Sequence, residues 1–267
     1  MAWVMLNYLV SFCSLVVMDF LRCQVLEDLL PTGFPFGYLV LIRGDLGMGK
    51  TLLVKLLARS VLSNYPLVYV SFDDNPESVV SDLKDFSSRL FIIDGFSLSD
   101  QRRVRASNVV DVITELDPGQ VVSKVGQAVY SRGARGLIID SINDLLINID
   151  PRGLVAMLKQ LKALSRLHNM VTFIVAHVTT EDIDNLLNSI EYVFDGVIEM
   201  EFDENMANLG IPVRRLRVKR MKGVSHSMNW YYFTTAKGTI VPVDINEIRN
   251  MLKNTLESLG IQVQQGG

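Results

Sequence analysis

The sequence contains few cysteines and few histidines, and each scarcity excludes a kind of site. Its two cysteines, Cys13 and Cys23, are too few for a disulfide framework or a cysteine-based zinc site. We therefore expect both to be reduced, as in a cytoplasmic protein. The three histidines show no metal-ligand spacing along the chain; they are His168, His177 and His226.

The chain also lacks an excess of charge of one sign. Its 26 basic and 29 acidic residues give a formal charge of −3, so the whole protein has no electrostatic attraction to nucleic acid. A contact with DNA would have to come from a local basic patch. Apolar residues make up 49% of the chain, which is enough for a sizeable core and excludes global disorder.

The N-terminal segment, residues 1–18, contains no charged side chain. Its length lies at the lower limit for a membrane-spanning helix, but it lacks the positive region and cleavage site of a signal peptide. It could be a membrane anchor, an element packed on the domain, or translated sequence upstream of a true start at Met18. We favour the last interpretation, which predicts a leader over 1–17, one folded domain over 18–260 and a polar tail over 261–267. A membrane partner is expected only if the leader is a real anchor.

A glycine-rich segment, GDLGMGKT at 44–51, matches the phosphate-binding loop pattern G-x-x-x-x-G-K-[ST] at every fixed position. The apolar run at 38–43 predicts a buried strand before it, and the helix formers at 52–62 predict a helix after it. Glycines allow backbone N–H groups to point at a polyphosphate, and the start of the helix adds its positive end. We expect a nucleoside triphosphate to contact Gly44, Asp45, Leu46, Gly47, Met48, Gly49, Lys50, Thr51 and Leu52.

Two side chains of this loop and one distant aspartate predict a site for a nucleoside triphosphate and Mg²⁺. Lys50 is placed to reach the β- and γ-phosphates, and the Thr51 hydroxyl to ligand the metal. The apolar run at 136–140 predicts a buried strand that ends in Asp140, a carboxylate that can hold Mg²⁺ through a water molecule. A strand that merely happens to end in aspartate is the alternative.

Two further aspartates, Asp73 and Asp74, follow the apolar run at 67–72. They are expected at the carboxyl edge of the sheet, where ligands bind in open α/β folds. Asp74 is the candidate base that orients water for hydrolysis, with Asp73 as its neighbour and Lys50 on the phosphates. Alternatively, this acidic pair only caps the helix that opens at Pro76.

The order of the predicted elements indicates the fold class. Apolar strands alternate with helices up to residue 176, which implies right-handed crossovers and a mainly parallel sheet covered on both faces. We expect a long helix over 151–167 and a surface loop over 95–118. From residue 196 short strands joined by polar turns predict an antiparallel extension, and a closing helix is expected over 245–259. The fold class is therefore three-layer α/β.

Five motifs are specific in combination: GDLGMGKT, FDDNPES, LIIDS, EYVFDGVIEME and VKRMKGVSH. With them the chain resembles the RecA/KaiC-like P-loop ATPase superfamily, in particular single-domain archaeal KaiC-like and RadC-like RecA paralogues, over about residues 26–243. The resemblance implies a RecA-like fold and ATPase activity. Members usually carry two glutamates, one of them the base, where Asp73 and Asp74 stand. Aspartate is shorter by one methylene, which implies slow hydrolysis.

The resemblance also implies a homo-oligomer. Members usually have K-M-R-G where this chain has R-M-K-G at 220–223, and those cations reach the γ-phosphate held by a neighbouring subunit. Arg220 and Lys222 are therefore candidates for a nucleotide site shared between protomers, and alternation along a strand would place both on one face. The alternative is a solvated basic strand. By the same resemblance His226 is a candidate for this interface and His177 for nucleotide sensing.

Two functions remain open. One is a nucleotide-dependent oligomeric switch or assembly module with slow hydrolysis. The other is a DNA-binding recombination-accessory ATPase that acts in DNA repair. The expected loops at 143–152 and 179–185, which correspond to DNA-contacting loops in RecA-type proteins, are acidic, whereas a phosphate backbone prefers Lys and Arg. We favour the switch, while Arg102, Arg103 and Arg105 offer a small basic patch for DNA at a side surface.

Overall fold

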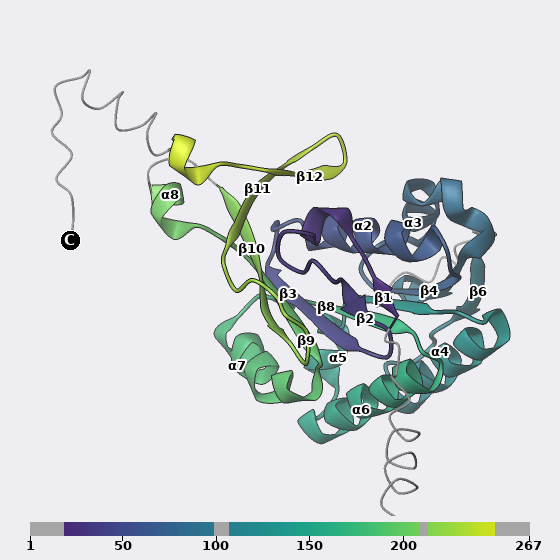
Figure 1. Cartoon of the computed structure of the whole chain (residues 1–267). Coiled ribbons are helices and arrows are strands. Elements are labelled where there is room, and N and C mark those ends of the chain that lie inside the picture. Colours follow the sequence, from purple (N-terminus) through teal and green to yellow (C-terminus); the bar gives the residue numbers. More distant parts are fainter. Residues whose placement is uncertain (1–18, 99–106, 209–212, 249–267) are drawn as a thin grey trace, which may run out of the picture.

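A ten-stranded sheet forms the centre of the molecule in the computed structural model, which describes residues 19–98, 107–208 and 213–248 (Figure 1). Seven strands from β9 to β6 pair in parallel, and β10, β11 and β12 add an antiparallel extension. The strands, in their order across the sheet, are β12 (Thr239–Pro242), β11 (Tyr231–Ala236), β10 (Arg214–Met221), β9 (Gly196–Phe202), β3 (Leu39–Asp45), β8 (Val171–Val178), β7 (Gly136–Asp140), β4 (Leu67–Ser71), β5 (Leu90–Asp94) and β6 (Val109–Val112).

Helices cover both faces of this sheet (Figure 1). One face carries α2 (Lys50–Leu62), α3 (Pro76–Asp82), η1 (Gln24–Leu26), η2 (Lys84–Arg89) and the small pair β1 (Phe20–Leu21) and β2 (Phe34–Pro35). The other face carries α4 (Pro118–Arg132), α5 (Asn143–Asn148), α6 (Pro151–Leu167), α7 (Glu181–Ile190) and η4 (Glu191–Val193). Two short elements, η3 (Phe96–Leu98) and α8 (Glu204–Asn208), follow β5 and β9. The fold is the predicted three-layer α/β architecture.

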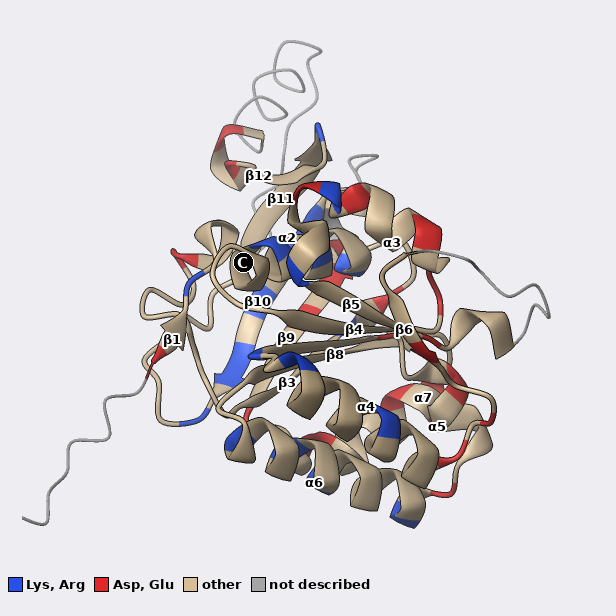
Figure 2. Ribbon diagram, turned by 90° about the vertical axis from the view of Figure 1, so that its right-hand side faces the viewer, with Lys and Arg blue, Asp and Glu red and all other residues tan. Residues whose placement is uncertain are grey.

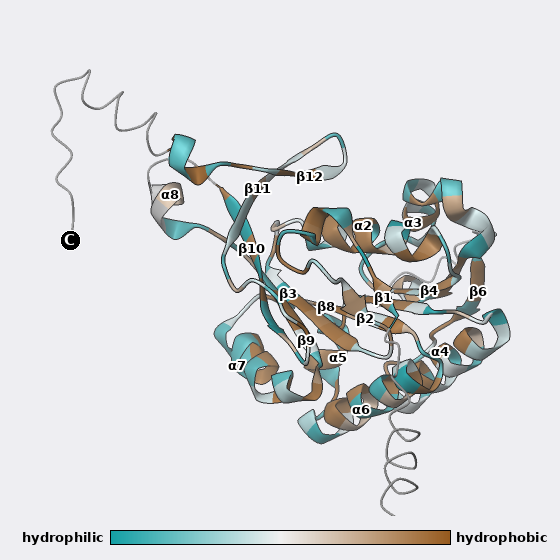
Figure 3. Ribbon diagram, in the orientation of Figure 1, coloured by the Kyte–Doolittle hydropathy of each residue, from teal (hydrophilic) through white to brown (hydrophobic). Residues whose placement is uncertain are grey.

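Alternation along the strands divides the core into two clusters. On β3, Val40 and Ile42 pack toward α2, whereas Leu39 and Leu41 pack toward α6. Both sets are fully buried, so the strands read as continuous apolar runs, as expected for a parallel sheet. Figure 3 shows the central strands in brown and the outward faces of α6 and α7 in teal.

Three helices begin with the same local signal, a polar residue followed by proline. The side chains of Asn75, Asp117 and Asp150 each accept a hydrogen bond from a backbone N–H of the first turn. Both predicted limits of α6 are confirmed, and the Asp150 cap explains where the helix starts. Asn75 caps α3, so Asp73 and Asp74 are not needed for that task.

The structure corrects three expectations about loops. The predicted loop at 95–118 contains β6, a half-buried edge strand whose four residues are too few for a clear periodic pattern. The expected loop at 143–152 contains α5, which buries Leu145 and Leu146. The expected loop at 179–185 contains the start of α7, because the Thr180 side chain caps that helix.

Several expected segments lie wholly or largely outside the described residues. These are the leader at 1–17, the basic patch around Arg102, most of the closing helix, which is described over 245–248, and the polar tail. Within the described ranges, the helices are all too short or too polar to cross a bilayer.

Candidate functional site

The phosphate loop joins the end of β3 to the start of α2 at the carboxyl edge of the sheet. Gly44 pairs with Met200 on β9, and a Cβ at Gly44 would overlap the Met200 carbonyl oxygen. Gly49 adopts a φ of 90° immediately before α2, a left-handed conformation that favours glycine. The first glycine is therefore required by packing and the last by the turn into the helix.

The amine of Lys50 lies inside the loop. The residue is 3% exposed, and Nζ donates hydrogen bonds to the carbonyl oxygens of Gly44 and Asp45 at 2.6 and 2.5 Å. Burial lowers the pKa of Lys50 to about 8, and this effect is opposed by the carboxylates of Asp45, Asp140 and Asp73. Lys50 therefore shares one electrostatic environment with the aspartate at the end of β7.

Asp140 is a buried carboxylate with an incomplete set of partners. It is 1% exposed, and the Tyr69 hydroxyl donates a hydrogen bond to Oδ2 at 2.8 Å. Among the described residues, Oδ1 has no hydrogen-bond partner although it is buried. Burial, together with the charges of Asp74 and Asp73, raises the pKa of Asp140 to about 6, although the hydrogen bond from Tyr69 acts to lower it. A buried acceptor of this kind fits a cation or its bound water.

Three side chains from neighbouring strands converge beside the loop. Ligand atoms of Asp73, Asp140 and His177 all lie within 4.8 Å of one another, and His177 Nε2 lies 2.9 Å from the Asp73 carboxylate. Asn143 fixes this arrangement: its side-chain amide donates to the His177 carbonyl, and its oxygen accepts the His177 N–H. The two carboxylates supply oxygen ligands, which Mg²⁺ prefers, so the residues present fit that ion.

The two adjacent aspartates point to different partners. Asp73 faces His177, and hydrogen bonds from His177 and Ser141 hold its pKa below the usual value despite burial. Asp74 instead pairs with Lys55 at 3.0 Å, one turn beyond Thr51 on α2. Both carboxylates act on Asp140 electrostatically. Their assignment as base and neighbour stays a prediction.

Two residues of this site carried no prediction. Tyr69 lies within an apolar strand, which hides its role in the sequence, although a tyrosine in such a run needs a partner for its hydroxyl. Asn143 follows the LIIDS motif and has no signal of its own in the sequence. Its bridge joins the start of α5, just after β7, to His177 on β8, a residue 34 positions away in sequence.

Arg220 and Lys222 lie far from the phosphate loop of their own chain. β10 runs antiparallel to β9, so Arg214 at its start contacts the loop through a 3.1 Å hydrogen bond to the Gly47 carbonyl, whereas Met221 pairs with Gly196 at the opposite edge of the sheet. β10 has a bulge between Val218 and Arg220 and ends at Met221, so strand alternation does not place Lys222. The Lys222 amine instead lies 3.9 Å from the Asp195 carboxylate.

Most basic residues of β10, seen in blue in Figure 2, have acidic partners, whereas Arg214 donates to Gly47 and Thr235. Arg215 pairs with Glu201 and Asp203, and Arg217 pairs with Glu199. A phosphate backbone would therefore have to displace existing ion pairs. β10 is not the solvated basic strand considered from the sequence. His226 lies near this extension, with Nδ1 2.9 Å from the Val224 carbonyl.

Comparison with known proteins agrees with this geometry. A family model described as "ATPase: KaiC" matches residues 23–247. The circadian clock oscillator proteins KaiC of Parathermosynechococcus lividus and Synechococcus elongatus are each 23% identical over 88% of this chain, which corresponds to 44% and 46% of those proteins. The chain thus spans less than half the length of these curated relatives. A crystal structure of a KaiC-like protein from Pyrococcus horikoshii superposes with a TM-score of 0.64 at 18% identity, covering 85% of this chain and 99% of that one.

Proposed function

The chain belongs to the KaiC ATPase family of RecA/KaiC-like P-loop proteins, and on that premise we propose that it binds ATP with Mg²⁺ between its phosphate loop and Asp140. The observation that carries this proposal is the shared environment of two residues from distant segments. The buried Lys50 amine lies inside the loop, and the buried Asp140 carboxylate, whose Oδ1 has no partner among the described residues, contributes to the charge around that amine. A triphosphate and its cation would place compensating charges between these groups.

Each residue of the site has a proposed role. The backbone N–H groups from Gly44 to Leu52 and the Lys50 amine bind the phosphates, and the Thr51 hydroxyl and Asp140 hold Mg²⁺. The bound cation would neutralise charge on the phosphate oxygens. Asp74 orients the attacking water with Asp73 beside it, and their short side chains account for slow hydrolysis.

We further propose that the protein acts as a nucleotide-dependent oligomeric switch built from a single domain over 18–260. The support is the position of Arg220 and Lys222 at the edge of the sheet opposite the phosphate loop. From there they cannot serve their own loop, but they can approach the loop of a second copy. The ion pairs along β10 give no support to the alternative, a DNA-binding repair ATPase.

Titration with a fluorescent ATP analogue and Mg²⁺ tests nucleotide binding. Lys50→Ala should abolish binding, because the buried amine is the one side-chain cation that the nucleotide-binding chain itself is proposed to supply to the phosphates. Lys124→Ala is the matched control, since Lys124 lies on α4 and pairs with Asp111 away from the loop. Equal affinities for the Lys50→Ala variant and the wild type would defeat the site assignment.

A further inference from the structure

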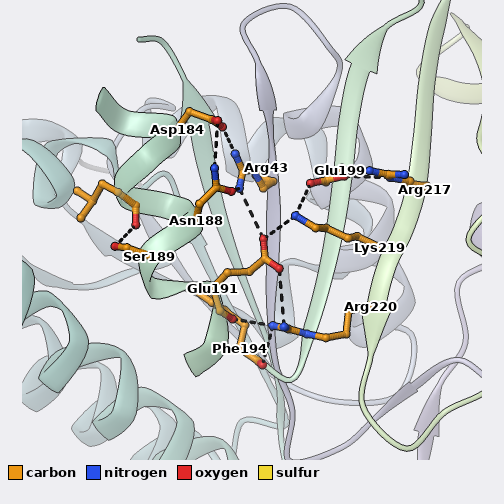
Figure 4. Close-up of polar contacts among 11 residues, drawn as sticks. Arg43, Asp184, Asn188, Ser189, Glu191, Phe194, Glu199, Arg217, Lys219 and Arg220 are labelled. Atoms are coloured by element: carbon orange, nitrogen blue, oxygen red, sulfur yellow. Dashed lines mark hydrogen bonds and ion pairs between the residues drawn. The ribbon is translucent and has the colours of Figure 1, made fainter. Parts of the chain in front are cut away.

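Glu191 is the centre of a charged network that runs along the α7 side of the sheet (Figure 4). Its side chain is 12% exposed and faces three cations. The carboxylate lies 2.9 Å from Lys219 Nζ, 3.6 Å from Arg43 Nη1 and 3.7 Å from Arg220 Nη1. The Glu191 backbone carbonyl also accepts a 2.6 Å hydrogen bond from Arg220 Nη2. One residue therefore holds the Arg220 guanidinium through both its side chain and its backbone.

The other end of this network is fixed to the strand that carries the phosphate loop. Arg43 is 5% exposed and immediately precedes Gly44. Its guanidinium is held by Asp184 and by Asn188, the latter at 2.7 Å, both from α7. A cavity of about 250 Å³ lies against Arg43 and reaches Gly44. Glu191 is thus anchored from the β3 side as well as from the Arg220 side.

Arg220 depends on Glu191 for its orientation. Among the described residues its Nε is buried without a hydrogen-bond partner. Beyond Glu191, the polar contact of Arg220 within the described part of the chain is a 3.4 Å hydrogen bond to the Phe194 carbonyl. Loss of the Glu191 charge would leave a long, flexible side chain with backbone acceptors alone, which hold the guanidinium less firmly than a charged partner does.

We propose that Glu191 is the positioning residue for Arg220: it fixes the guanidinium for the ATP of a second copy of this chain and anchors it to β3 through Arg43. This inference rests on the proposed shared site. It adds a residue that contacts no nucleotide itself, and it gives the EYVFDGVIEME segment a role in the site formed with the neighbouring copy.

The test uses two chains that can form one complete site only together. Arg220→Ala chains bind the nucleotide, and Lys50→Ala chains, which bind none, donate Arg220. The rate at which a fluorescent ATP analogue with Mg²⁺ leaves the Arg220→Ala chains is measured before and after mixing. Because a charged hydrogen bond to phosphate is worth about tenfold in affinity, mixing should slow release by about that factor. This readout does not require hydrolysis.

Glu191→Gln is then placed on one chain at a time. On the Arg220-donating chain it should reduce the slowing; on the nucleotide-binding chain it should leave the slowing intact. The matched control is Glu199→Gln on the donating chain, since Glu199 pairs with Lys219 and Arg217 but not with Arg220. This control should slow release as the unmodified donor does.

The outcomes separate the inference from its premise. If mixing never slows release, the shared site fails and the inference fails with it. If mixing slows release and Glu191→Gln on the donating chain still slows it fully, the shared site stands and the role of Glu191 is overturned. Equal losses from either chain would indicate a general weakening of the fold and would also overturn it.

Discussion

Replacing Asp140 with asparagine should stabilise the protein in the absence of metal and nucleotide. Asp140 is 1% exposed, and burial raises its pKa to about 6, whereas an aspartate in an unfolded chain has a pKa of about 3.9. A folded pKa above the unfolded one means that ionisation opposes folding at neutral pH. The difference of about 2 pKa units corresponds to roughly 3 kcal/mol.

The sign and pH range follow from these two values. The destabilisation is complete above about pH 6, falls to roughly half at pH 5 and vanishes below about pH 4. The asparagine oxygen can still accept the hydrogen bond from Tyr69, so little is lost in exchange. We expect Asp140→Asn to raise the free energy of unfolding by about 1–3 kcal/mol at pH 7.5, with a smaller gain at pH 5.

Urea unfolding in EDTA at the two pH values measures this gain. Asp94→Asn is the matched control: Asp94 is equally buried at the end of β5, but its carboxylate accepts hydrogen bonds from the Ser97 N–H and hydroxyl at 3.0 and 2.6 Å, so no gain is expected. With Mg²⁺ and ATP added, the wild type should be stabilised more than Asp140→Asn. An Asp140→Asn protein no more stable than the wild type at pH 7.5, or a gain that does not shrink at pH 5, would refute the reasoning.

Three other predictions concern packing, a thiol and an ion pair. Gly44→Ala should lower the free energy of unfolding by about 1–3 kcal/mol, because its methyl group would overlap a backbone carbonyl of β9; Gly126→Ala on α4 meets only ordinary contacts and should not do so in the same denaturation assay. Burial raises the pKa of the Cys23 thiol, so in a chain whose other cysteine is serine, a thiol reagent should react slowly until urea unfolds the protein. Burial alone would raise the pKa of Glu199, but its ion pairs with Lys219 and Arg217 on β10 hold that pKa below its usual value. The wild type should therefore melt at a higher temperature than Glu199→Gln at pH 7. This difference should disappear as the pH falls through the lowered pKa of Glu199; a difference that persists in acid would contradict this.

Local patterns predicted the parts of the molecule that depend on neighbouring residues. The phosphate loop lies between a strand and a helix because glycine and lysine occupy fixed positions in a short segment. The start of α6 follows from Asp150 and the proline after it. Asp140 ends a buried strand because its apolar run is continuous and stops there.

Contacts between distant strands could not be predicted in this way. The divergence of Asp73 and Asp74 depends on His177 and Lys55, which reach the site from β8 and α2. β6 is short and packs on one neighbour only, so its pattern resembled a loop. The pairing of β10 with acidic residues depends on the register with β9, which a single sequence does not reveal.

The placement of the phosphate loop and Arg220 at opposite ends of the sheet has a consequence for assembly. If the proposed shared site forms between parallel copies, the Arg220 end of one copy meets the loop end of the next, and one surface of each kind stays unused. Such copies close into a ring or continue as a filament. A two-fold dimer would join both pairs of surfaces only with its two copies antiparallel.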